Sequence, residues 1–126
     1  MQKELLCKAA LEARENSYSP YSGCRVGAAL LADSGKVYLG ANVENASFSP
    51  TICAERSAFA AAVSAGERSF SAIAVTGGEK AFPPCGVCRQ VMSEFCSPDF
   101  KIYIVAGDEC REYTLGELLP EAFSLE

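Results

Sequence analysis

The chain has 126 residues, a formal net charge of −5 and no histidine. This length predicts a single domain, residues 1–126. The negative charge and scattered cations do not form the basic patch of a nucleic-acid binder, so we expect no nucleic-acid partner. The missing histidines exclude a Ser-His-Asp triad, a Cys-His dyad and any histidine metal ligand.

The apolar runs and the cysteines indicate where such a chain works. No run approaches the roughly 18 apolar residues of a membrane helix, and the N-terminus lacks the segment order of a signal peptide. We therefore expect a cytoplasmic protein with no membrane partner. Seven cysteines cannot all pair internally. In a cytoplasmic chain, clustered cysteines are more often metal ligands or catalytic groups than disulfides.

The first half of the chain reads as a helix, a hairpin and a loop. Apolar residues recur at helical spacing over residues 3–15, which predicts an amphipathic helix. Residues 26–31 form a short apolar run, a turn follows at Asp33-Ser34-Gly35, and apolar residues alternate over 37–41. This pattern predicts a β-hairpin. Residues 42–51 are polar and are expected to form a loop.

The second half alternates helices with strands. A helix is predicted from residue 53 to residue 65, and a strand over 72–76. A further helix is expected to start near Cys85, and a further strand over 102–105, followed by a short tail. This alternation predicts a layered α/β domain with a mixed sheet.

Two cysteine groups lie where helices are expected to begin. Cys53 stands alone at one start, and Cys85 and Cys88 lie three residues apart at the other, so their sulfurs can face one point. Free N–H groups and the helix dipole at such a start favour thiolate, the form that binds metal. Three protein ligands leave the fourth position of a zinc ion open for water. The sequence therefore predicts one zinc ion per chain.

Two charged residues follow Cys53 directly. Glu55 is close enough in sequence to lie beside the metal without binding it, and to carry protons between water and substrate. Three thiolates and Zn²⁺ sum to a charge of about −1, which weakens the metal as a Lewis acid. Arg56 is expected to offset this charge by donating to one or more of the sulfurs.

Other interpretations of the cysteines remain open at this point. A lone Cys-x-x-Cys is also typical of a redox pair, and a structural zinc site would need a fourth protein ligand. The candidates for a fourth ligand are Cys7, Cys24, Cys96 and Cys110. Cys96 is the poorest candidate, because helix rise puts it about 16 Å from Cys85.

Stretches along nearly the whole chain follow one family pattern. They are Ser19-Pro20-Tyr21-Ser22, Val26-Gly27-Ala28-Ala29-Leu30, Asn42-Val43-Glu44-Asn45-Ala46-Ser47, Cys53-Ala54-Glu55-Arg56, Pro84-Cys85-Gly86-Val87-Cys88-Arg89-Gln90 and Leu118-Leu119-Pro120-Glu121-Ala122-Phe123. With them the chain resembles the cytidine deaminases of the short, homotetrameric, zinc-dependent type. The resemblance implies a three-layer α/β/α fold with a five-stranded mixed sheet. It also implies hydrolytic deamination of cytidine and 2′-deoxycytidine in pyrimidine salvage, with release of ammonia.

The resemblance also implies roles for single residues. Cys53, Cys85 and Cys88 would bind zinc, Glu55 would carry protons, and Arg56 would temper the thiolate charge. Asn42 and Glu44 would bind the ribose hydroxyls, which suits an amide and a carboxylate. The charge on Glu44 would also repel a 5′-phosphate, so nucleosides should be preferred to nucleotides. Ala46, Phe48 and Phe123 match positions that reach the pocket of a neighbouring subunit in a homotetramer.

Two residues depart from the family pattern in the expected substrate pocket. Cys24 stands where the family commonly has phenylalanine near the pyrimidine, and Phe48 stands where tyrosine is common. A smaller side chain at Cys24 would weaken the pyrimidine contact or widen the pocket. This leaves a second hypothesis, a deaminase for a modified nucleoside, against which the Asn42 and Glu44 pair argues. A third is a zinc-stabilised module without catalytic activity.

Overall fold

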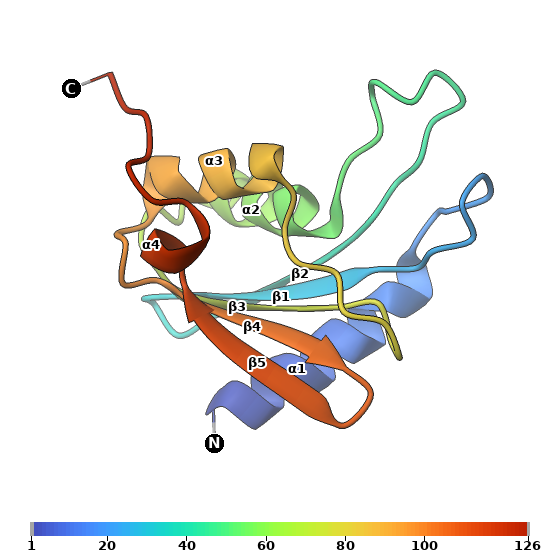
Figure 1. Ribbon diagram of the computed structural model, residues 1–126, viewed down its shortest axis with the longest axis horizontal. Coiled ribbons are helices and arrows are strands. Elements are labelled where there is room, and N and C mark those ends of the chain that lie inside the picture. The colour runs from blue at the N-terminus through green and yellow to red at the C-terminus, as the bar shows by residue number, and fades with distance from the viewer. Residues whose placement is uncertain (1, 126) are drawn as a thin grey trace.

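The computed structural model describes residues 2–125, which form a five-stranded sheet with helices on both faces (Figure 1). In chain order the elements are α1 (Gln2–Ala13), the 3-10 turn η1 (Arg14–Asn16), β1 (Gly27–Ala32), β2 (Val37–Ala41), α2 (Ala54–Ser64), β3 (Phe70–Thr76), α3 (Gly86–Phe95), β4 (Lys101–Ala106), β5 (Glu109–Thr114) and α4 (Leu115–Leu118). The strand order is β2-β1-β3-β4-β5. Strands β3 and β4 are parallel and the other pairs are antiparallel, so the sheet is mixed, as expected.

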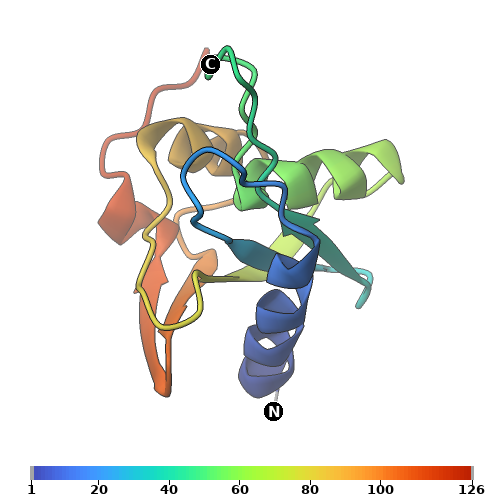
Figure 2. The same ribbon diagram turned by 90° about the vertical axis from the view of Figure 1, so that its right-hand side faces the viewer.

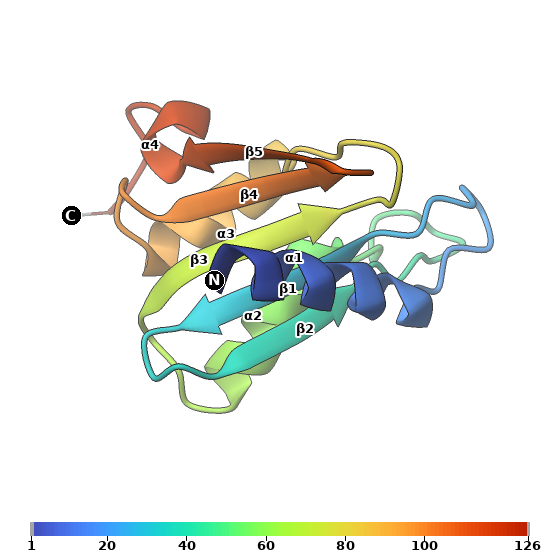
Figure 3. The same ribbon diagram turned by 90° about the horizontal axis from the view of Figure 1, so that it is seen from below.

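The sheet lies between one helix on one face and two on the other. Helix α1 packs on β1 and β3 from one side, and α2 packs on β2 and β1 from the opposite side, with α3 beside it (Figures 1 and 3). Every residue of β1 is buried because the strand is covered on both faces. A strand covered in this way reads as a continuous apolar run rather than an alternating one. The three-layer α/β/α prediction is confirmed.

Two glycines let the helices lie directly on the sheet. A Cβ on Gly27 would come within 2.1 Å of the Ala10 carbonyl oxygen in α1. A Cβ on Gly40 would come within 2.3 Å of the Ala54 carbonyl oxygen in the first turn of α2. Real Cβ atoms do not approach backbone so closely, so only glycine fits at either place. The start of α2 is therefore held at a fixed height above β2.

The larger hydrophobic core lies under α2 and α3. Phe59 is buried there and its ring lies 5.1 Å from that of Phe70 and 6.2 Å from those of Phe95 and Phe100, centroid to centroid. Aromatic contacts at such distances add to the free energy of burial. A smaller core around Leu6 joins α1 to the other face of the sheet. The larger core thus fixes the two helices that begin at the cysteine groups.

The last strand and the last helix were not predicted from the residue pattern. Strand β5 pairs with β4 from Lys101↔Thr114 to Ala106↔Glu109 and forms an edge of the sheet. Most of its side chains are exposed or half-buried and polar, so its sequence carries no clear apolar alternation. Thr114 and Glu117 then form a capping box that starts α4.

Three loops leave the sheet at the same end. Gly27 at the start of β1 is paired with Ala41 at the end of β2 and with Thr76 at the end of β3. The loops over residues 17–26, 42–53 and 77–85 therefore begin or end side by side, as Figure 2 shows. Among residues 2–125, no helix has both the length and the apolar character needed to span a membrane.

Candidate active site

The sulfurs of Cys53, Cys85 and Cys88 meet at this end of the sheet. The Cys53 and Cys85 Sγ atoms are 3.9 Å apart, and those of Cys85 and Cys88 are 3.4 Å apart. All three sulfurs lie within 4.8 Å of one another, and no other group of three or more metal-binding side chains occurs in residues 2–125. Sulfurs bound to one tetrahedral zinc at about 2.3 Å would be about 3.8 Å apart. The geometry and the donor atoms therefore fit one zinc ion per chain.

Both helix starts are built to leave the sulfurs free. Cys53 and Cys85 are the N-cap residues of α2 and α3, with extended backbone, and neither side chain caps its helix. Cys88 lies in the first turn of α3 and is fully buried. The unpaired N–H groups of both helices point towards this end and favour negative charge on the sulfurs. The helix starts expected near Cys53 and Cys85 are confirmed.

Contacts among the sulfurs and Arg56 make one thiolate easy to form. Hydrogen bonding with Cys88, followed by the hydrogen bond and the charge of Arg56, lowers the pKa of Cys53 to about 5 in spite of its burial. The Arg56 Nη2 atom donates to Cys53 Sγ at 3.3 Å, as expected, and to the Thr51 carbonyl at 3.4 Å. A positive group therefore lies against the cluster on its protein side.

Glu55 is buried beside the cluster. It is 5% exposed and lies one residue after the first residue of α2, two residues after Cys53. Burial raises the pKa of Glu55 to about 7. Glu55 is not a member of the sulfur cluster. A buried carboxylate in this position can hold or release a proton beside the metal without binding it.

A cavity of about 230 Å³ opens onto the cluster. Its walls include Cys53, Cys85, Glu55 and Asn42, so the structure brings four of the predicted residues to one space. The remaining walls are largely apolar and come from Val26, Thr51, Ile52, Ala54, Phe82 and Pro83. This combination of apolar walls and a few polar groups is typical of a small-molecule site.

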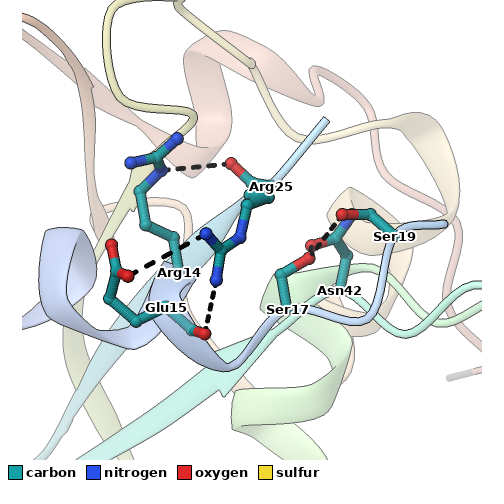
Figure 4. A network of polar contacts seen from close by, with 6 residues as sticks. All are labelled: Arg14, Glu15, Ser17, Ser19, Arg25 and Asn42. Atoms are coloured by element: carbon teal, nitrogen blue, oxygen red, sulfur yellow. Dashed lines mark hydrogen bonds and ion pairs between the residues drawn. The ribbon is translucent and has the colours of Figure 1, made fainter. Parts of the chain in front are cut away.

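The side chain of Asn42 is fixed by the loop that precedes β1. Its Oδ1 accepts from Ser17 Oγ at 2.5 Å and from the Val26 N–H at 3.0 Å, and its Nδ2 donates to the Cys24 carbonyl at 2.8 Å. Figure 4 shows Ser17 and Ser19 grouped around the amide. A primary amide has two N–H donors. One donor of Asn42 therefore remains for a ligand.

Two arginines anchor the same loop to the end of α1. Arg14 Nε donates to the Arg25 carbonyl at 3.3 Å, and Arg25 Nη2 donates to the Glu15 carbonyl at 2.5 Å (Figure 4). Arg25 also pairs with the Glu15 carboxylate at 3.9 Å. These contacts hold the chain immediately before β1, and with it the partners of Asn42.

Glu44 lies in the wall of a second cavity, of about 400 Å³, with Tyr21, Ser22, Phe48 and Thr51. One Glu44 oxygen accepts from the N–H groups of Tyr21 at 2.9 Å and Ser22 at 3.1 Å, and the other accepts from the Ser22 hydroxyl. These hydrogen bonds, that of the Ser22 side chain first, lower the pKa of Glu44. Thr51 lines both cavities, so they are neighbours.

Phe48 is exposed and strained. It is 72% exposed, and its φ of 64° lies in the left-handed region. Its ring meets that of Tyr21 edge-on at 6.5 Å. A bulky residue in this conformation is uncommon and tends to mark a functional segment.

Three predicted residues lie apart from the cluster within this chain. Cys24 is half-buried and, among the described residues, lines neither cavity; its carbonyl holds Asn42 instead. Ala46 is exposed, and Phe123 is 68% exposed with its carbonyl accepting from Gln90 at 3.3 Å. Their expected roles at the pocket, including a neighbouring subunit's pocket, stay predictions.

The remaining cysteines do not complete a four-cysteine zinc site. Cys7 and Cys110 face each other with sulfurs 3.8 Å apart, joining α1 to β5. Burial, then the neighbouring Cys110, raises the pKa of Cys7 to about 12. Neither these two nor Cys24 and Cys96 belong to the metal cluster among residues 2–125. The structural zinc site with a fourth cysteine is therefore not formed.

Sequence reasoning missed the apolar wall of the metal cavity. Phe82 and Pro83 come from the loop before Cys85, and Ile52 comes from the residue before Cys53. Their one visible signal is that they directly precede metal-binding cysteines. Such proximity in sequence does not say which side chain turns towards the cavity.

Comparison with known proteins gives consistent matches. Residues 1–104 match the family model described as the cytidine and deoxycytidylate deaminase zinc-binding region. A cytidine deaminase of Halalkalibacterium halodurans is 51% identical over 100% of this chain and 97% of its own length. One from Sporosarcina psychrophila is 50% identical over 100% of this chain and 94% of its own length. The crystal structure of cytidine deaminase from Burkholderia pseudomallei superposes with a TM-score of 0.93 at 46% identity, covering 98% of this chain and 100% of that one.

Proposed function

This chain belongs to the cytidine and deoxycytidylate deaminase family, and we propose that it deaminates cytidine and 2′-deoxycytidine by hydrolysis. The products are uridine or 2′-deoxyuridine and ammonia. The observation that carries this assignment is the buried carboxylate of Glu55 in the same cavity wall as Cys53 and Cys85. Neither a redox pair nor a structural zinc site needs such a group, whereas an acid–base reaction does.

The residues of the chain divide the chemistry between them. Zinc bound by the three thiolates lowers the pKa of a water molecule towards about 7, so that a nucleophile exists at neutral pH. Glu55 accepts the proton of the water that adds to C4 of the base. It then delivers protons to N3 and to the exocyclic nitrogen, which leaves as ammonia. Arg56, which donates to Cys53 Sγ at 3.3 Å, reduces the excess negative charge of the thiolates.

The two neighbouring cavities suit the two halves of a nucleoside. The base lies in the cavity with Glu55, and the sugar extends past Asn42 towards Glu44. The free donor of Asn42 and the carboxylate of Glu44 bind the ribose hydroxyls. The charge of Glu44 disfavours a 5′-phosphate, so nucleosides are preferred to nucleotides.

We further propose that residues 1–126 form one deaminase domain that acts in pyrimidine salvage in the cytoplasm. The partner is a second, third and fourth copy of the chain, in a homotetramer. Exposed Phe48 and Phe123 support this, because large apolar side chains in loops gain stability when a neighbouring subunit covers them. In the tetramer, these two residues and Ala46 reach the pocket of a neighbour, and Cys24 borders the pyrimidine.

The test is turnover of cytidine by the purified chain, followed by its ultraviolet absorbance. We expect one zinc per chain and release of ammonia in equal amount with uridine. Glu55→Gln is expected to keep the zinc and to lower kcat by about 10²- to 10⁴-fold. Glu12→Gln, in exposed α1, is the control and should retain wild-type activity. Full zinc loading without turnover of cytidine or deoxycytidine contradicts the proposed function.

A further inference from the structure

Phe82 is an aromatic residue in the metal cavity to which the chemistry above gives no part. It lies three residues before Cys85, is half-buried, and shares the cavity wall with Glu55 and Asn42. An apolar ring beside a carboxylate and an amide does not take part in proton transfer. Its position instead suits contact with the flat face or edge of a bound base.

The ring rests on a glycine at the end of β3. A Cβ on Gly77 would lie 2.1 Å from both Cδ2 and Cε2 of Phe82, so the ring sits directly over the Gly77 backbone. No side chain other than hydrogen leaves room for the ring at this position. Gly77 thus determines where the Phe82 ring lies.

The seat of the ring is rigid. Gly77 pairs with Lys80 across a tight turn, in which the Gly78 N–H donates to Thr76 Oγ1 at 3.0 Å. The Gly107 N–H donates to the Gly78 carbonyl at 2.8 Å, which ties the turn to the β4–β5 connection. A wall that is already in place needs no ordering when a ligand binds.

The other side of Phe82 is equally constrained. Pro83 and Pro84 follow it, and the proline rings restrict the backbone of residues 82–84. The Pro84 carbonyl accepts from Arg89 Nε at 2.7 Å, and Arg89 Nη1 donates to the Leu118 carbonyl at 2.7 Å. The ring is therefore fixed relative to Cys85 as well as to the sheet.

We infer that Phe82 is a specificity-determining residue, whose ring, seated on Gly77, forms the wall against which the pyrimidine ring packs. This inference rests on the proposed function, because it assigns a contact to the base of the same substrate. Offset or edge-on contact between two aromatic rings corresponds to about threefold to tenfold in affinity beyond the burial of area.

The test is a cycle of four proteins: wild type, Gly77→Ala, Phe82→Ala and the double variant. Each single change should raise KM for cytidine about threefold to tenfold and weaken uridine binding similarly, with kcat within about twofold. In the double variant the new methyl group occupies the space that the ring has left. The double variant should therefore be no worse than Phe82→Ala alone.

A structural role for Phe82 predicts different results. Zinc content should stay at one per chain in every variant, and Phe82→Leu, which keeps most of the apolar volume, should still raise KM. Tyr103→Leu is the control, because Tyr103 is a half-buried aromatic that packs in the smaller core on the opposite sheet face, and its KM should not change.

Several results would overturn the inference. They are an unchanged KM in Phe82→Leu, strictly additive losses in the double variant, loss of zinc in Phe82→Leu, or an equal rise of KM in Tyr103→Leu. If wild-type protein turns over cytidine and any of these occurs, the inference on Phe82 fails alone. If wild-type protein does not turn over cytidine, the proposed function and the inference fail together.

Discussion

The metal centre and the loops that would hold the sugar differ in how completely the chain builds them. At the centre, Cys88 is 1% exposed and Glu55 is 5% exposed, and both lie in the first turns of helices packed on the larger core. In the loops, Phe48 is 72% and Phe123 68% exposed. The centre is thus finished within one chain, whereas the outer loops present apolar side chains that nothing in residues 2–125 covers fully.

The difference shows what each region needs from the fold. Metal-binding sulfurs must be placed to within a few tenths of an ångström, which rigid helix starts on a packed core can provide. The loop residues Asn42 and Glu44 are instead held by hydrogen bonds to neighbouring loop segments. Changes at the centre should therefore abolish activity, and changes in the loops should mainly weaken substrate binding.

Removal of a buried metal ligand should have the largest effect. In Cys88→Ala, zinc content should fall well below one per chain and activity should fall by more than about a hundredfold, because the activated water is lost. Cys96→Ala, at the other end of α3, is the matched control and should keep zinc and activity. The measurements are zinc content by metal analysis and initial rates with cytidine. A fully active Cys88→Ala would remove the metal centre from the mechanism.

The positive group beside the sulfurs should have the next largest effect. Arg56→Gln removes the charge that donates to Cys53 Sγ, and should lower kcat/KM or zinc affinity about tenfold to a hundredfold. Arg68→Gln, where the arginine donates to the Val63 and Glu67 carbonyls at the far end of α2, should change neither. Rates and a zinc competition titration separate the two effects. Equal losses in both variants would point to a general destabilisation of α2.

The loop carboxylate should act on binding rather than on the chemical step. Glu44→Gln should raise KM about tenfold with kcat little changed, since a hydrogen bond to a charged group is weakened. Glu67→Gln is the matched control, because Glu67 also accepts from two hydroxyl groups, those of Ser34 and Tyr38, but far from both cavities. An unchanged KM combined with a lowered melting temperature would show that Glu44 only supports its loop.

The smallest effect is expected at the strained aromatic residue. Phe48→Ala should raise KM only a few-fold, because the ring is exposed and contacts Tyr21 alone among the rings described. Phe48→Gly should be more stable than Phe48→Ala by about 1 kcal/mol, because glycine adopts the left-handed backbone without strain. Chemical denaturation measures this difference. A more stable alanine variant would mean that the left-handed φ is not retained in solution.

The residue pattern predicted the helices and strands whose burial is strong. The hairpin, the helix starts at Cys53 and Cys85, and the strands β3 and β4 are confirmed, with ends shifted by a few residues. Strand β5 was missed because one polar, largely exposed edge strand has no apolar alternation to detect. It was expected only through the five-stranded sheet of the family that the sequence resembles.

The site divides in the same way. The metal-binding residues, Glu55 and Arg56 follow from residue types and spacing at two helix starts, and the structure brings them together. Cys24 was expected near the pyrimidine, yet within the chain its backbone carbonyl, not its side chain, is tied to the pocket through Asn42. Spacing along a loop does not fix which way a side chain points, because loop backbones lack a regular period.

The sequence by itself determined the chemistry: three thiolates and one carboxylate at helix starts leave few reactions open, because ligand type and spacing are local properties. Only the tertiary structure decided the walls of the pocket. The Phe82 ring is brought to the cavity by its contact with Gly77 and by a turn tied to Gly107 on another connection. Contacts of this kind depend on which strands lie side by side and how closely their loops approach, and no local pattern of residues encodes that.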